Sequence, residues 1–180
     1  MRSLTPGLHG NHPRRVSGLT LIELLVTMSV LAVLLAVGIP SFASLMQRWR
    51  VDATIESLVA DIRLARSTAT RTSRAVVMCA RAADGNCSAG NDWSTGWVVF
   101  SDLNGDSALD VGEPLIAERP NQSGMASMPD KTSQARLTFR ANGTLESGKT
   151  SVGIRPKDSA KTVASVVINA MGRTRVQTIN

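Results

Sequence analysis

The chain has 180 residues, of which 43% are hydrophobic, 3% aromatic and 19% charged. This composition suits one globular domain with an added segment, and it excludes a disordered or low-complexity chain. The formal net charge is +6, which makes an anionic partner or surface worth considering. Two Cys and two His, His9 and His12, are too few for a four-ligand zinc site. They also argue against a Ser-His-Asp or Cys-His centre in the body of the chain.

An apolar segment near the N-terminus comes first in the chain. Leu19–Ile39 contains 21 residues, and Glu23 is its one charged residue. About 20 apolar residues in a helix span the hydrocarbon core of a bilayer. Residues 1–18 carry three arginines and no acid, which predicts a cytoplasmic N-terminal flank and an outward C-terminal part. The run is longer than the apolar core of a secretory signal, and no clear small-x-small site follows it, so we expect the segment to be retained.

Glu23 is unusual within this segment. A carboxylate in an apolar membrane helix costs about 2.5–3.5 kcal/mol on insertion scales, so it is a candidate functional residue. No cationic residue lies within one helical turn of it in the membrane segment. Cleavage between Gly18 and Leu19 would create an amino group four residues before Glu23. In an assembly, that amine of one subunit would pair with Glu23 of its neighbour.

The sequence RRVSG at Arg14–Gly18, followed by LTLIEL at Leu19–Leu24, resembles the leader and cleavage motif of type IV prepilins. The resemblance implies that prepilin peptidase removes residues 1–18, that the new N-terminus at Leu19 is methylated, and that Glu23 directs assembly with other pilins into a filament. Leu19 stands where the family usually has Phe. The implied location is the inner membrane, single-pass with the C-terminal domain in the periplasm, and then the pilus at the cell surface.

Residues 19–40 are thus expected to form the membrane and filament-core helix, and residues 41–74 its amphipathic continuation. Pro40 matches the kink proline of the prepilin family, and a proline inside a helix kinks it. Beyond it, apolar residues recur at helical spacing, namely Leu45, Trp49, Ile55, Leu58, Val59, Ile62, Ala65 and Ala69. Arginines lie mainly off this stripe and indicate a solvated face or a supporting basic surface; they are Arg48, Arg63, Arg66, Arg71 and Arg74.

Residues 75–180 change to short segments rich in Val, Ile, Thr or aromatic residues and separated by turn residues. The predicted strands are Ala75–Cys79, Trp97–Ser101, Ala135–Arg140, Ser151–Arg155, Thr162–Asn169 and Arg175–Ile179. Asn142-Gly143 indicates a hairpin. One long helix packed on an antiparallel β domain is an α+β fold.

A second resemblance lies in the C-terminal part. Ala65-Arg66-Ser67, the strand with Cys79, the Trp-x-x-Gly-Trp-x-x-Phe segment at Trp93–Phe100, and the turn at Asp102–Asp110 are similar to the FimT/GspH group of minor pilins and pseudopilins. This implies a pilin-like fold and a subunit present in few copies.

Cys79 and Cys87 are eight residues apart, with Asp84-Gly85-Asn86 between them. The outward topology places them in an oxidising compartment, where such a pair forms a disulfide. A metal or redox role lacks a third ligand and a Cys-x-x-Cys motif at a helix start, so the disulfide is favoured.

Acidic residues follow the Trp-containing segment with offsets like those of an EF-hand loop: Asp102, Asn104, Asp106, Asp110 and Glu113. Calcium prefers such oxygen clusters. However, Ser107 occupies the position that requires glycine, and flanking helices are not evident. These residue types are also common in tight turns, so a turn is favoured over a calcium site, and no metal or cofactor is expected.

Charge is segregated in the C-terminal part. Residues 75–118 have one base and seven acids, a net charge of −6, whereas residues 119–180 have ten bases and three acids, a net charge of +7. Gly172-Arg173-Thr174-Arg175 places two arginines two residues apart, on one side of an extended strand. Paired guanidinium groups suit phosphate. Arg155, Lys157 and Lys161 are weaker candidates, chosen from their proximity in the sequence.

The Gly-Arg-x-Arg segment resembles the C-terminal motif of FimT-type minor pilins. This implies binding of extracellular DNA for uptake in natural transformation, through Arg173 and Arg175. Because no aromatic platform accompanies them, we expect phosphate contacts to duplex DNA rather than stacking on single strands. The alternative reading of the arginines is a strand edge kept soluble by charge.

Two functions stay open: a DNA-binding minor pilin that also supports pilus biogenesis, or a structural minor pilin or type II secretion pseudopilin that primes assembly without binding DNA. An enzyme is the least favoured class, because no nucleophile elbow or phosphate loop is present.

Overall fold

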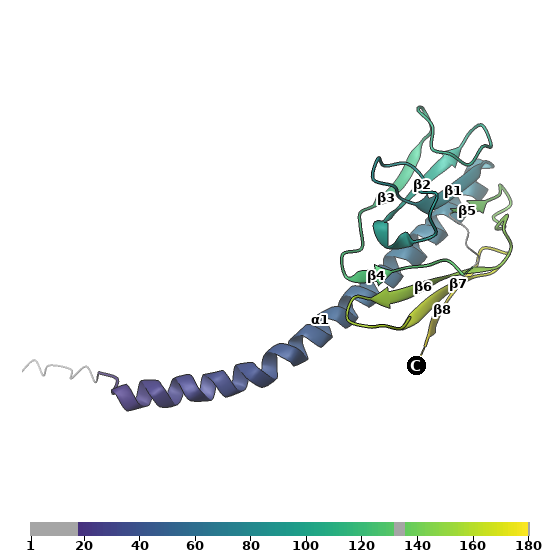
Figure 1. The fold of residues 1–180 in the computed structure, drawn as a ribbon. Coiled ribbons are helices and arrows are strands. Elements are labelled where there is room, and N and C mark those ends of the chain that lie inside the picture. Colours follow the sequence, from purple (N-terminus) through teal and green to yellow (C-terminus); the bar gives the residue numbers. More distant parts are fainter. Residues whose placement is uncertain (1–17, 132–135, 180) are drawn as a thin grey trace, which may run out of the picture. The chain divides into compact units, whose positions relative to one another are not determined.

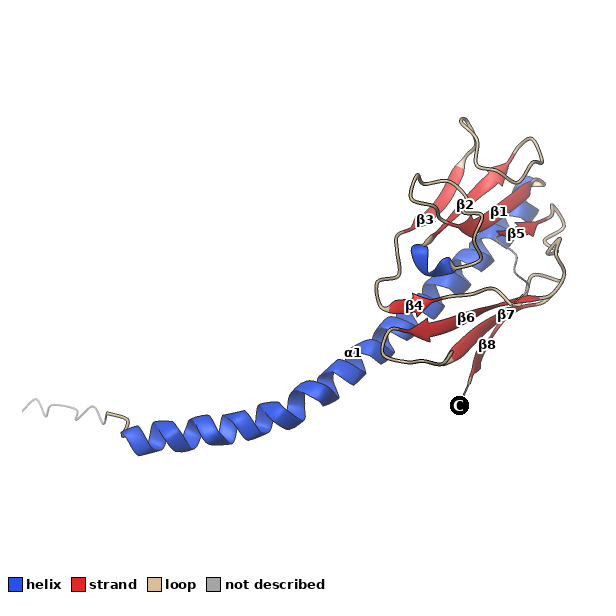
Figure 2. Ribbon diagram, in the orientation of Figure 1, coloured by secondary structure: helices blue, strands red, loops and turns tan. Residues whose placement is uncertain are grey.

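The computed structural model describes residues 18–131 and 136–179. The prepilin leader, apart from Gly18, lies outside these residues. The chain divides into two compact units, Met1–Phe42 and Ala43–Asn180, and each is treated separately below. Among the described residues there is one long helix, α1 (Leu21–Thr72), followed by a short 3₁₀ helix and eight strands (Figures 1 and 2).

The start of α1 is fixed by local capping. The Thr20 hydroxyl oxygen accepts a hydrogen bond from the backbone N–H of Glu23 at 3.2 Å, which satisfies one of the free donors of the first turn. Glu23 lies in this first turn, where a negative charge interacts favourably with the helix dipole. Pro40 lies inside α1, so the prediction that the helix continues past the proline is confirmed.

The first unit exposes its apolar side chains, including Leu25, Val33 and Ile39. Within the described part of the chain, α1 is the helix whose length and composition would allow it to cross a membrane. Its apolar window therefore agrees with the segment that the sequence predicts to enter the bilayer.

In the second unit, α1 buries the apolar stripe that the sequence predicts. Its members Ile55, Leu58, Ile62, Ala65 and Ala69 are buried, and Val59 is half-buried. The first two members of the stripe, Leu45 and Trp49, are 42% and 58% exposed. Val51 is the first residue of α1 that packs against this core, so the two preceding members of the stripe are left uncovered.

Two four-stranded antiparallel sheets follow the helix. The first has the order β3-β2-β1-β5 and the second the order β4-β6-β7-β8 (Figure 1). The bounds are β1 Ala75–Ala80, η1 Trp93–Thr95, β2 Trp97–Asp102, β3 Leu115–Arg119, β4 Met125–Ser127, β5 Arg136–Phe139, β6 Thr150–Pro156, β7 Ala164–Ile168 and β8 Thr174–Thr178. Figure 2 shows the strands of both sheets beside the C-terminal half of α1, which confirms the α+β fold.

All six predicted strands are present, with ends shifted by one or two residues; Ala135 lies outside the described residues. Two strands, β3 and β4, were not predicted. β3 is an edge strand with the sequence LIAER and its Leu115 is exposed, whereas β4 has three residues. Neither segment shows the run of alternating apolar residues from which a strand is recognised.

A polar contact ties α1 to the first sheet inside the apolar core. The carboxylate of Asp61 is 3% exposed and pairs with Arg119 on β3, with Nε–Oδ2 and Nη2–Oδ1 distances of 2.7 and 3.0 Å. The same carboxylate accepts a hydrogen bond from the indole N–H of Trp97 on β2 at 2.9 Å. Bonding to Asp61 raises the pKa of the Arg119 guanidinium above its ordinary value. These three bonds fix the helix against two neighbouring strands.

The predicted disulfide is confirmed: Cys79 on β1 is bonded to Cys87, and the Cα atoms are 5.5 Å apart. Cys79 belongs to a second apolar cluster with Val77, Val98 and Phe100, and Cys87 packs against it. The disulfide thus joins the loop after β1 to the side of the sheet that carries this smaller cluster. Within this loop, bonds from the backbone and side-chain N–H groups of Asn86 hold the pKa of Asp84 below its ordinary value.

The acidic loop after β2 forms an ordered turn. Both oxygens of Asp102 accept backbone N–H groups, from Gly105 at 2.6 Å and Ser107 at 3.0 Å. Both oxygens of Glu113 do the same, from Leu103 at 2.7 Å and from Asp110 at 3.1 Å. Among the described residues, no three His, Cys, Asp or Glu side chains form a group suited to a metal ion. The hydrogen bonds of this loop are therefore accounted for by a tight turn.

Candidate nucleic-acid interface

The predicted DNA-binding arginines follow a tight turn between β7 and β8. The Gly172 N–H donates to the Asn169 carbonyl at 2.8 Å, and Gly172 has a φ of +70°, which favours glycine. The Arg173 N–H donates to the side-chain oxygen of Asn169 at 2.9 Å, and the Asn169 N–H donates to the Arg173 carbonyl at 3.0 Å. Both backbone polar groups of Arg173, its N–H and its carbonyl, are therefore bonded to Asn169.

β8 is an edge strand with two different faces. Val176 pairs with Val166 of the core, and Arg175 pairs with Val167, which is half-buried. Side chains alternate along a strand, so Arg175 lies on the face opposite to Val176. Both Arg173 and Arg175 are exposed, and neither forms an ion pair with a carboxylate among the described residues. Two exposed guanidinium groups, without ion pairs in the described residues, are thus close together in the chain at the start of β8, the edge strand of the second sheet.

The three weaker candidates for DNA binding, Arg155, Lys157 and Lys161, do not all lie near Arg173 and Arg175. Ile154 is buried in the core, so its neighbour Arg155 lies on the other face of the sheet, as Arg175 does. Arg155 is half-buried, and its Nε atom has no hydrogen-bond partner in the described part of the chain. Lys157 and Lys161 are exposed in the connection from β6 to β7, whereas the arginine turn follows β7. β7 separates these two ends by roughly 13–17 Å, so the structure does not bring the lysines to the arginine pair.

Arg66 on α1, which the sequence groups with the solvated or supporting arginines, packs against the arginine turn. Its Nε–H donates to the Gly143 carbonyl at 3.1 Å, in the turn after β5. A Cβ atom on Gly172 would lie 2.8 Å from Cδ of Arg66, so this side chain also packs against the turn that precedes Arg173. Of the other arginines predicted for the solvated face, Arg48, Arg63 and Arg71 on α1 and Arg74 just after it are exposed. Arg66 lies four residues after Ile62 and three before Ala69, at the border of the buried stripe, and this position was the available signal.

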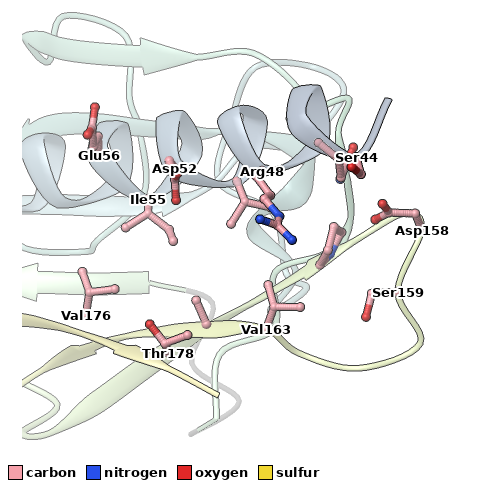
Figure 3. A pocket seen from close by; sticks show the side chains of 14 residues that line it. Ser44, Arg48, Asp52, Ile55, Glu56, Asp158, Ser159, Val163, Val176 and Thr178 are labelled. Atoms are coloured by element: carbon pink, nitrogen blue, oxygen red, sulfur yellow. The ribbon is translucent and has the colours of Figure 1, made fainter. Parts of the chain in front are cut away.

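A groove lies on the other side of β8, between this strand and α1 (Figure 3). Its volume is about 730 Å³, and Val176 and Thr178 line it together with apolar residues of α1. Its charged lining residues are Arg48, Asp52, Glu56 and Asp158. Three carboxylates against one guanidinium make this groove a poor site for phosphate. The arginines and the groove are therefore separate features on opposite faces of β8.

The family model described as type II transport protein GspH matches residues 54–172, which is more than half of the chain. The chain belongs to the GspH family. A second model, the prokaryotic N-terminal methylation motif, matches residues 13–39, which include Gly18, Leu19 and Glu23. These matches confirm the resemblance to type IV minor pilins and pseudopilins, and they indicate processing by a peptidase, anchoring in the inner membrane and assembly with other pilins.

Solved structures agree with this GspH-family fold. Two crystal structures of the type IV minor pilin FimU of Pseudomonas aeruginosa match with TM-scores of 0.57 and 0.54. Each is 21% identical to this chain; the first match covers 74% of this chain and 90% of FimU, and the second 70% and 91%. At this identity the likeness shows the fold alone. The search of curated proteins found no match. The GspH match ends at Gly172, so Arg173 and Arg175 lie beyond it.

Proposed function

We propose that this GspH-family chain is a minor type IV pilin that binds duplex DNA through Arg173 and Arg175 at the cell surface, for uptake in natural transformation. The observation that carries the proposal is the pair of exposed guanidinium groups after a rigid turn, without a carboxylate partner in the described residues. Such groups hold phosphate oxygens by two parallel hydrogen bonds.

The path to the surface follows from the N-terminal motif. Prepilin peptidase would cut between Gly18 and Leu19, and methylation would modify the amino group of Leu19. The basic flank before the cut retains the N-terminus in the cytoplasm and leaves the second unit in the periplasm. In the filament, the amine of one subunit would pair with Glu23 of the next, which offsets the cost of placing this carboxylate in an apolar layer.

DNA binding is tested by fluorescence anisotropy of a labelled duplex with residues 43–180. This unit contains all the buried hydrophobic residues of the described chain, and circular dichroism would verify its folding. Contacts to phosphate alone predict a dissociation constant of about 10⁻⁴–10⁻⁶ M at physiological salt and no sequence preference. The Arg173→Ala/Arg175→Ala variant should bind more weakly, with the slope of log K against log salt reduced by about 2.

The matched control is Arg63→Ala/Arg71→Ala, which removes the same charge from two exposed positions on α1. It should retain most of the binding and the slope of the wild type. Equal binding by the wild type and the Arg173→Ala/Arg175→Ala variant would refute DNA binding through these residues.

The second candidate is a type II secretion pseudopilin or structural minor pilin that primes assembly without DNA. The description of the matching family, type II transport protein GspH, favours this candidate. Complementation of a deletion strain separates the two. If Arg173→Ala/Arg175→Ala restores filament formation but not DNA uptake, the DNA-binding function holds. If the deletion impairs protein secretion and leaves DNA uptake unchanged, the pseudopilin function holds instead.

A further inference from the structure

The outer edge of β8 has no strand paired with it among the described residues. β8 ends the strand order β4-β6-β7-β8, so β7 is its one neighbour there. The Asn169 N–H donates to the Arg173 carbonyl at 3.0 Å, and the Ile179 N–H donates to the Val163 carbonyl at 2.8 Å, so both ends of the β7–β8 pair are hydrogen-bonded pairs. Bonded and non-bonded pairs alternate along an antiparallel ladder. The residues of β8 whose backbone N–H and C=O groups point away from β7 are therefore Thr174, Val176 and Thr178.

The side chains of this free edge face the groove between β8 and α1. Val176 and Thr178 line the groove opposite Ile55 of α1 (Figure 3). Val176 pairs with the buried Val166 but is itself 46% exposed, because the groove leaves it uncovered. Edge strands are usually protected by lysine, by proline or by a covering segment. The sequence of β8, TRVQT, contains neither lysine nor proline, and its one charged side chain, Arg175, lies on the face away from the groove.

The flank of α1 beside the groove is apolar at one end and acidic at the other. Its residues are spaced by four, three and four positions, which places them on one face of the helix; they are Leu45, Trp49, Asp52 and Glu56. All four are exposed, and Trp49 is 58% exposed. Within the described part of the chain, neither Asp52 nor Glu56 takes part in an ion pair. A strand added to the edge of β8 would lie about 4.8 Å beyond it, next to the two acidic residues, which line the groove.

The charge of the groove identifies the kind of segment that fits this edge. The charged lining residues are three acids and one base, Asp52, Glu56, Asp158 and Arg48, so the groove attracts a basic side chain. A second copy of this chain, paired edge to edge about a two-fold axis, would bring its own acidic flank of α1 against Asp52 and Glu56, and like charges disfavour that arrangement. The charges therefore favour an extended segment of a different chain, with basic and apolar side chains.

We propose that the outer edge of β8 and the groove beside it bind an extended cationic segment of a neighbouring pilin by strand addition. The GspH and N-terminal methylation matches indicate assembly with other pilins, which makes such a neighbour available. The backbone of the segment pairs with Val176 and Thr178, and every second side chain enters the groove. There an apolar side chain contacts Ile55 and a basic one reaches Asp52. The proposal is independent of DNA binding, because Arg175 lies on the opposite face of β8.

Strand addition is tested with a capped seven-residue peptide that alternates threonine with valine and lysine. Its binding to residues 43–180 is followed by NMR, with the backbone amides of Val176 and Thr178 as reporters. In the free protein these amides should exchange rapidly with solvent, and the peptide should shift their signals and slow their exchange. Added salt should weaken the binding, because the groove attracts the lysine by its charge. Absence of any shift up to about 1 mM peptide overturns the proposal.

The backbone contribution is tested by Val176→Pro, which removes an N–H that points away from β7. Proline is tolerated on an edge strand at such a position, so the fold should be retained, as circular dichroism would verify. The variant should bind the peptide about tenfold more weakly. The control Val176→Thr keeps the N–H and should stay within about threefold of the wild type. If folded Val176→Pro binds as tightly as Val176→Thr, strand addition is overturned.

The charge preference is tested by Asp52→Lys/Glu56→Lys, which changes two exposed positions on α1 and leaves β8 intact. This variant should bind the lysine peptide several-fold more weakly than the wild type does, and it should prefer a peptide in which glutamate replaces lysine. An unchanged preference for the lysine peptide overturns the assignment of a cationic partner.

The identity of the partner is tested by sedimentation and in cells. The wild type should sediment as a monomer; a dimer that Val176→Pro dissociates would show that a second copy takes the edge, and it would overturn the assignment to a different pilin. In a complemented deletion strain, Val176→Pro should reach the membrane but enter filaments less than Val176→Thr does. Equal incorporation of the two variants would overturn the role of this edge in assembly with a neighbouring pilin.

Discussion

The Asp61 carboxylate offers the sharpest stability prediction. Asp61→Ala removes the partner of two donors, the Trp97 indole N–H and the Arg119 guanidinium. Trp97 is fully buried, so its N–H would be left without a partner at a cost of about 1–3 kcal/mol. The side chain of Arg119 is 43% exposed, so water would replace its bonds and this loss is about 1 kcal/mol or less. Together we expect a decrease of about 1–4 kcal/mol in the free energy of unfolding.

The assay is urea unfolding of residues 43–180 followed by circular dichroism at constant pH. Asp61→Asn is the matched comparison, since its amide oxygen still accepts the Trp97 bond while the charge is lost. Asp61→Asn should lower the free energy of unfolding by about half as much as Asp61→Ala does. A loss below about 1 kcal/mol for Asp61→Ala, or an equal loss for Asn and Ala, would refute the claim that these bonds fix α1 to the first sheet.

The remaining predictions concern the disulfide, the turn and the N-terminal segment. Cys79→Ser/Cys87→Ser should lower the free energy of unfolding by about 2–3 kcal/mol in the chain-entropy model, as measured by urea titration, and added reductant should then have no further effect. Gly172→Ala should cost more than about 1 kcal/mol, because the new Cβ meets Arg66 and the Gly143 carbonyl at a positive φ; an unchanged melting temperature would contradict this packing. Glu23→Val should abolish incorporation into filaments while the protein still inserts into the membrane, and sheared filament fractions that contain the variant at wild-type levels would count against the pairing of Glu23 with a neighbour.

The sequence predicts the order and type of the secondary-structure elements well, because each of them is recognised from a local pattern. The apolar segment, the prepilin motif and the change from helical to strand spacing are all readable without tertiary contacts. The stripe on α1 predicts the buried residues correctly from Ile55 onward. Leu45 and Trp49 belong to the same stripe but are exposed, because amphipathicity shows which face of a helix is apolar and not how far the sheets extend along it.

The sequence also determined the candidate site in part: Arg173 and Arg175 were found as a motif, and their exposure agrees with that interpretation. Only the tertiary structure placed Arg66, more than a hundred residues earlier in the chain, against the turn that precedes them, and it separated Lys157 and Lys161 from them. Proximity in the sequence does not show which residues meet in the fold. Lys157 and Lys161 lie before β7 and the arginine turn lies after it, so the length of this strand separates them, whereas Arg66 reaches that turn from α1. Likewise, Asp61 in an apolar stripe becomes understandable only when Trp97 and Arg119, from two strands, are seen to meet its carboxylate.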